Sequence, residues 1–203
     1  MRLAVLTGIY VAVVCSAQIG ALKIIRLPFT HLDAPGGVYL IGLALALVQA
    51  AHYTAPTRRE GAVNAQMMIL LGFVGSGILA AYIAIVVHSA SAFPGQGFDS
   101  TVGSTWRIVV ASLAAFIVSE TVDNVVGAPL RGRVPDAVRI AVTAGISAPI
   151  DSVVFLTAAF GGRGLHFFTG QIVGKIGAAL VIGLPTVLAA RRYVVLRATS
   201  EAA

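Results

Sequence analysis

Residues 65–88, AQMMILLGFVGSGILAAYIAIVVH, contain no Asp, Glu, Lys or Arg. An apolar helix of about 20 residues crosses the hydrocarbon layer of a bilayer, so this stretch predicts a membrane span. Gly72, Gly75 and Gly77 superficially resemble a phosphate-binding glycine loop. No predicted strand precedes them, however, and close packing of helices is the better interpretation.

The rest of the chain has the same apolar character. Of its 203 residues, 58% are hydrophobic and 11% are charged, whereas a soluble domain carries about 25% charged residues. The short connections between apolar stretches leave no room for a soluble catalytic domain, and we interpret residues 54–64 as a cytoplasmic loop. We therefore expect one all-α integral membrane domain over residues 1–203, with six spans at about 4–22, 36–53, 65–88, 105–127, 138–160 and 167–190.

Basic residues gather at the ends of the predicted spans. The net charge of +6 does not form a stripe or a tail, so we expect no nucleic-acid partner. With six spans both termini share one side, and that side collects nine of the fourteen Lys and Arg residues against four on the other. The positive-inside rule then predicts both termini in the cytoplasm, with the protein in a bacterial-type inner membrane.

Three later spans each carry a polar residue followed four positions later by an ionisable one: Ser119 and Asp123, Ser147 and Asp151, Gln171 and Lys175. This spacing places each pair on one helical face. A charge at the centre of a bilayer costs about 2.5–3.5 kcal/mol on insertion scales, so such groups are expected to face a partner, a cavity or a ligand. The pattern predicts a polar site enclosed in the bundle.

The depth of the charges predicts one specific contact. At about 1.5 Å per residue, Asp151 lies roughly 20 Å from the cytoplasmic start of its span and Lys175 roughly 12 Å from the outer start of its own. The two sit at nearly the same level, which predicts an Asp151–Lys175 ion pair or a ligand held between them. Glu120 and Asp123 come out nearer the cytoplasm. Pro149 is expected to disturb its helix beside the site.

Two alternatives stay open for these polar residues. An intramembrane Asp–Lys pair with Ser and Gln neighbours can simply hold helices together instead of binding a ligand. Arg107, at the outer start of its span, is either an anchor that snorkels to the interface or a contact to substrate.

Metal and enzyme chemistry find little support. Cys15 is the single cysteine, so no internal disulfide and no thiolate cluster can form. The histidines are scattered without ligand spacing, and no Ser or Cys has a recognisable His partner. We expect no metal, no cofactor and no catalytic residues.

The residues of the polar spans resemble the queuosine precursor transporter family, also called the vitamin uptake transporter family. The resemblance runs in order and spacing through four segments: 107–112 (RIVVAS), 119–123 (SETVD), 147–155 (SAPIDSVVF) and 170–175 (GQIVGK). In the first half, residues 34–39 (APGGVY) look like the start of the family's second span. The sequence departs from the family at Val48-Gln49, where an acidic residue is common.

The resemblance implies a six-span fold similar to the substrate-binding subunit of energy-coupling-factor transporters, and uptake of 7-deazaguanine bases or related purine-like solutes. In such a site carboxylates accept the N–H groups of the base, cationic and amide side chains donate to its carbonyl, and a phenylalanine offers a stacking face. The implied substrate-binding residues are Arg107, Ser119, Glu120, Asp123, Ser147, Asp151, Phe155, Gln171 and Lys175, with Phe116 as a second stacking candidate.

The sequence leaves alternatives to a standalone transporter open. The chain could be a substrate-capture subunit that works with an external ATPase module, with Ala17 and Ala21 as a small-residue docking surface, or it could form a homodimer. A different class is a membrane enzyme acting on a lipid or a carotenoid. A purely structural membrane protein would bind no small molecule.

Overall fold

The computed structural model describes residues 3–89, 106–161 and 167–201. Its helices are α1 (Leu3–Gly20), α2 (Val38–Ala51), α3 (Arg58–His88), α5 (Trp106–Leu130), α6 (Asp136–Phe160), α7 (Phe168–Ala178) and α8 (Leu184–Glu201). A 3-10 turn, η1 (His52–Thr54), extends α2, and a π-helical segment, η3 (Ala179–Gly183), joins α7 to α8. Within the described residues, five helical stretches are long and apolar enough to cross a membrane, and Val38–Thr54 is a shorter apolar helix. The predicted all-α membrane fold with six helices is confirmed.

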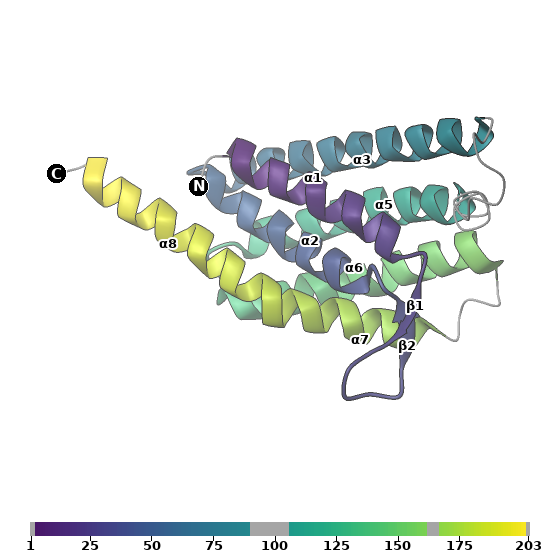
Figure 1. The fold of residues 1–203 in the computed structure, drawn as a ribbon. Helices are drawn as coiled ribbons and strands as arrows, with labels where there is room; N and C mark the ends of the chain where they lie inside the picture. The colour runs from purple at the N-terminus through teal and green to yellow at the C-terminus, as the bar shows by residue number, and fades with distance from the viewer. Residues whose placement is uncertain (1–2, 90–105, 162–166, 202–203) are drawn as a thin grey trace.

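The short helix α2 lies in the middle of the bundle. Residues on all its sides are buried, and it contacts α1, α3, α5, α6, α7 and α8. A helix that is apolar all round is stable only when other helices surround it. Figure 1 shows α2 enclosed in this way. Because its neighbours shield it from lipid, α2 does not need the length of a lipid-exposed span.

A small hairpin precedes α2. Strands β1 (Ile24–Arg26) and β2 (Asp33–Pro35) pair antiparallel, and the exposed Arg26 and Asp33 side chains form an ion pair of 3.0 Å across them. The sequence predicted only turns here. The hairpin lies at the opposite end of the bundle from the start of α1 and the end of α8 (Figure 1).

Helix α3 begins earlier than the apolar pattern predicts. Thr57 and Glu60 form a capping box, in which the Thr57 hydroxyl accepts from the Glu60 amide and the Glu60 carboxylate accepts from the Thr57 amide. These bonds satisfy amides that the first helical turn otherwise leaves unpaired. The interpretation of residues 54–64 as a loop was therefore wrong for most of that stretch.

The last span is interrupted beside the predicted site. The predicted span at 167–190 contains the π segment η3, and Pro185 follows directly in α8. Proline lacks the amide that would donate to the carbonyl four residues earlier, which explains a disturbed hydrogen-bond ladder at this point. The sequence placed its expected disturbance at Pro149 instead, where α6 is continuous from Asp136 to Phe160.

Candidate functional site

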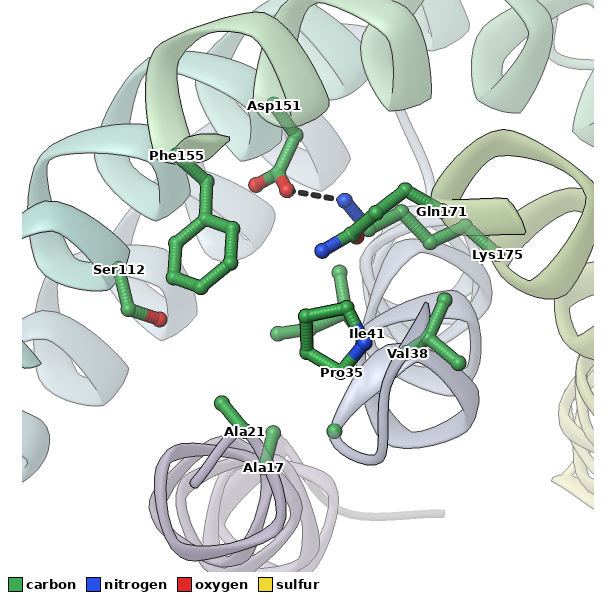
Figure 2. A pocket seen from close by; sticks show the side chains of 11 residues that line it. Ala17, Ala21, Pro35, Val38, Ile41, Ser112, Asp151, Phe155, Gln171 and Lys175 are labelled. Atoms are coloured by element: carbon green, nitrogen blue, oxygen red, sulfur yellow. Dashed lines mark hydrogen bonds and ion pairs between the residues drawn. The ribbon is translucent and has the colours of Figure 1, made fainter. Parts of the chain in front are cut away.

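A pocket opens among α1, the end of β2, α2, α5, α6 and α7. It contains about 320 Å³ of empty space, which includes its open mouth. Of this space, a water-sized sphere can occupy only about 20 Å³, which is room for about one water molecule, so the pocket has to widen to hold a ring system. The side chains of Gln171 and Ser112 point into it, and Phe155 forms one wall (Figure 2). Its lining residues are Ala17, Ala21, Pro35, Gly37, Val38, Ile41, Ser112, Asp151, Phe155, Gln171 and Lys175.

The charged centre of the pocket is an ion pair between α6 and α7. The Lys175 ammonium nitrogen lies 2.5 Å from Asp151 Oδ2, and both side chains are almost fully buried. The Asp151–Lys175 pair predicted from helix depth is thus confirmed. Two hydroxyls complete it: Ser119 donates to Asp151 Oδ1 at 2.9 Å, and Lys175 donates to Ser152 Oγ at 3.0 Å.

A buried ion pair of this kind is costly to assemble. Each charge loses its hydration, and mutual attraction repays the loss only when the geometry is good and the other polar atoms find partners. The hydroxyls of Ser119 and Ser152 provide those partners. A wall of the pocket is therefore preorganised and charged, and a ligand that replaces one ion-pair contact can use the free carboxylate or ammonium directly.

A second polar cluster lies behind the pocket. The Gln49 amide donates to the Asp123 carboxylate and, at 3.1 Å, to the Asp123 main-chain oxygen. Ser147 donates to Asp123 Oδ1 at 3.5 Å. Gly127 leaves room for Gln49, because a Cβ there would overlap the Gln49 amide. These three polar side chains are fully buried and do not line the pocket.

Glu120 stands apart from both clusters. It is fully buried, and neither carboxylate oxygen accepts a hydrogen bond from the described residues. Tyr10 of α1 faces it, and Asp123, Asp151 and Lys175 act on it electrostatically. A carboxylate in such a place must be neutralised or find a counter-charge, because an isolated buried charge costs several kcal/mol.

The predicted site residues therefore fall into four groups. Asp151, Phe155, Gln171 and Lys175 line the pocket, and Ser119 reaches it through Asp151. Asp123 and Ser147 belong to the second cluster, and Glu120 lies in neither. The side chain of Arg107 lies outside the described part of the chain. Of the two stacking candidates, Phe155 lines the pocket, whereas Phe116 packs on the Tyr10 ring with centroids 6.0 Å apart.

Sequence reasoning missed the apolar side of the pocket. Pro35, Gly37, Val38 and Ile41 come from β2 and the start of α2, a segment without charged residues after Asp33. Its resemblance to the family's second span was the one available signal. Ala17 and Ala21, which the sequence suggested as a small-residue docking surface, are both buried and line the pocket.

Glycines hold α2 and α7 close together around the ion pair. A Cβ on Gly42 of α2 would overlap the main-chain oxygen of Lys175, and one on Gly174 of α7 would lie 2.7 Å from a methyl group of Val38. Such close approach of backbones is typical of small residues in membrane bundles. It fixes the position of Lys175 relative to the wall that α2 provides.

Comparison with known proteins identifies the family. A family described as "Putative vitamin uptake transporter" matches residues 54–190, which include all three polar helix pairs. The chain belongs to this family of membrane transporters. No curated protein and no solved structure matches it.

Proposed function

We propose that this protein imports a small heterocyclic solute, most specifically a 7-deazaguanine precursor of queuosine or a related purine-like base. The observation that supports the proposal is a charged pair, Asp151–Lys175, buried in a membrane bundle and yet lining an open pocket. A pair that served packing alone would not need space beside it.

The chemistry of the lining suits a flat base with an amide edge. Asp151 accepts ring and exocyclic N–H groups, while Lys175 and Gln171 donate to the ring carbonyl. Phe155 offers a face or an edge to the ring system, and Val38 and Ile41 cover its apolar parts. Charged groups that already stand in place lower the ordering cost of binding.

The position of the pocket suits uptake. Its lining includes Pro35 of the hairpin and Gly37 just after it, and the hairpin lies at the end of the bundle opposite the start of α1 and the end of α8 (Figure 1). With both termini in the cytoplasm of a bacterial-type inner membrane, as the basic residues predict, the mouth faces outward and receives solute from outside. We propose this orientation, and labelling of single cysteines placed at Phe29 and near the C-terminus tests it.

A standalone carrier and a capture subunit for an ATPase module remain distinct proposals. The burial of Ala17 and Ala21 removes the sequence-based argument for a docking surface in α1. We favour the standalone carrier for that reason. Copurification of a stoichiometric ATPase from native membranes would contradict it, and uptake by the purified protein alone in liposomes supports it.

Phe155→Ala is expected to weaken ligand binding and also to lower the stability of the protein without ligand, because the ring is buried and packs on Phe160. Deleting the ring removes the stacking wall of the pocket but not the ion pair. The measurement is a thermal-shift screen of the purified protein against deazapurines, purines and water-soluble vitamins, because a ligand that binds only the folded state raises its apparent stability. Phe73→Ala is the control, since Phe73 lies exposed on α3 and does not line the pocket. An equal shift in both variants would contradict the placement of the ligand.

We further propose that uptake is coupled to protons and that Glu120 carries the proton. Asp151 and Asp123 already have close donors, whereas the buried Glu120 carboxyl has only the Tyr10 hydroxyl facing it and no cation paired with it among the described residues. Proton uptake there neutralises a charge that the site otherwise leaves unpaired. The groups that face it are Tyr10, Asp123, Asp151 and Lys175.

Glu120→Gln is expected to abolish the dependence of uptake on a proton gradient without changing equilibrium ligand affinity. The measurement compares uptake into proteoliposomes with and without an imposed inward gradient. Glu120→Asp keeps a titratable carboxyl and is expected to retain the dependence. Wild-type uptake that is unchanged when the gradient collapses would contradict proton coupling. The ligand pocket is tested separately, by the binding measurements.

A further inference from the structure

Four arginines surround a hollow at the other end of the bundle from the pocket. Arg58 begins α3, Arg131 and Arg133 lie in the turn between α5 and α6, and Arg191 comes from α8. We call this the arginine hollow; it contains about 960 Å³ of empty space including its open mouth, and no acidic side chain of the described residues lines it. Gly132 has φ of 69°, a left-handed conformation that glycine adopts without strain and that allows this turn.

Three contacts hold the Arg131 side chain in place beside the hollow. The Arg131 guanidinium donates to the main-chain oxygens of Thr57 and Ala55 at 2.9 and 2.8 Å, and it lies over the ring of Tyr53 at 5.1 Å. Partial burial, and then the like charges of Arg139 and Arg58, lower the pKa of Arg131. The Arg131 guanidinium therefore has a fixed position at the hollow, and no carboxylate among the described residues that line the hollow neutralises its charge.

Arg58 and Arg133 add further N–H donors at the hollow that make no hydrogen bond within the described residues. Arg58 gives its Nε to the Arg131 main-chain oxygen at 2.8 Å, which leaves its two terminal nitrogens unpaired among the described residues. The Arg133 side chain is exposed and has no polar partner in that part of the chain. Asp136 is already bound to Tyr53, to Arg139 at 3.6 Å and to Arg191 at 3.1 Å.

We propose that the arginine hollow binds the phosphate group of an anionic phospholipid. Guanidinium forks match phosphate oxygens in geometry and in charge. Basic pockets between membrane helices at the cytoplasmic side are suited to anionic headgroups. The hollow lies where α3 and α6 begin and α5 ends. Val63 of α3 and Val138 of α6 follow these helix starts, and they are 55% and 47% exposed, as is typical of side chains that face lipid. A lipid fits this arrangement better than a free phosphate, because its acyl chains cover those side chains.

The test measures binding of phosphatidylglycerol to the intact protein in a neutral detergent, by native mass spectrometry, with phosphatidylcholine of the same chains and inorganic phosphate as comparison ligands. The Arg58→Gln/Arg133→Gln variant is expected to lose affinity for phosphatidylglycerol by about fivefold for each arginine removed, the effect of one basic residue at an anionic surface. The control is Arg59→Gln/Arg192→Gln, which removes the same net charge from exposed arginines that do not line the hollow.

A loss confined to the first variant, with phosphatidylglycerol bound in preference to phosphatidylcholine, supports the proposal. An equal loss in the control pair means a diffuse surface charge and overturns it. Saturable binding of inorganic phosphate with no preference between the two lipids overturns the assignment to a lipid. Arg133→Gln alone keeps the test available if the double variant does not fold, because that side chain makes no polar contact within the described residues.

Discussion

Lys175→Met is expected to destabilise the folded protein by about 3–5 kcal/mol, the usual cost of leaving one member of a buried ion pair without its partner. Methionine has a similar length and no charge, so the Asp151 carboxylate keeps its buried position but loses the ammonium at 2.5 Å. The measurement is reversible unfolding in mixed micelles. Ligand binding is expected to disappear in the same variant.

The double variant Asp151→Asn/Lys175→Met separates the two effects. It contains no uncompensated charge, so much of the lost stability is expected to return, because a neutral replacement of a buried pair is often tolerated. Ligand binding is expected to stay absent, since neither the acceptor nor the cationic donor is present. A single variant that is as stable as the double variant would show that the pair is not coupled in the membrane-embedded protein.

Gly42→Ala is expected to destabilise the protein by about 1–3 kcal/mol, as overpacking at a tight contact does. The added Cβ would overlap the Lys175 main-chain oxygen and would lie 2.7 Å from the Ala178 Cβ. Helices α2 and α7 must then separate, which displaces both Lys175 and the apolar wall of the pocket. We expect ligand affinity to fall together with stability, measured on the same purified sample.

Gly177→Ala is the matched control for this substitution. Gly177 lies in α7, two residues after Lys175, and a Cβ there meets no heavy atom within 4 Å. Alanine also favours the helix by up to about 1 kcal/mol relative to glycine. The control is expected to be neutral or slightly stabilising. A similar loss in both variants would show that the effect comes from the α7 backbone and not from the contact with α2.

Much of the fold follows from hydropathy alone. The spans at 105–127 and 138–160 match α5 and α6 within a few residues, because long apolar stretches leave few alternatives in a membrane. The start of α3 was missed, since the capping box of Thr57 and Glu60 extends the helix through a polar segment. The π segment before Pro185 was missed as well, because whether a proline kinks, bulges or leaves a helix unchanged depends on its neighbours.

The site could be predicted in part. Helical spacing and depth were enough to pair Asp151 with Lys175, because both rest on the geometry of a single helix and the thickness of the bilayer. They could not separate Asp123 and Ser147 from the pocket. That division depends on the rotation of α5 and α6 against α2, where Gln49 contacts Asp123. Gln49, which stands where the family commonly has an acidic residue, is thus a hydrogen-bond partner of the candidate site residue Asp123.

Equilibrium binding of 7-deazaguanine to the purified wild type and to Asp151→Asn/Lys175→Met tests the central claim most directly. The account predicts saturable one-to-one binding by the wild type. It also predicts a loss of at least about 100-fold in the variant, which corresponds to two hydrogen bonds to charged groups at about 1.5–3 kcal/mol each. Binding of equal affinity in both proteins would contradict a ligand site at the buried ion pair.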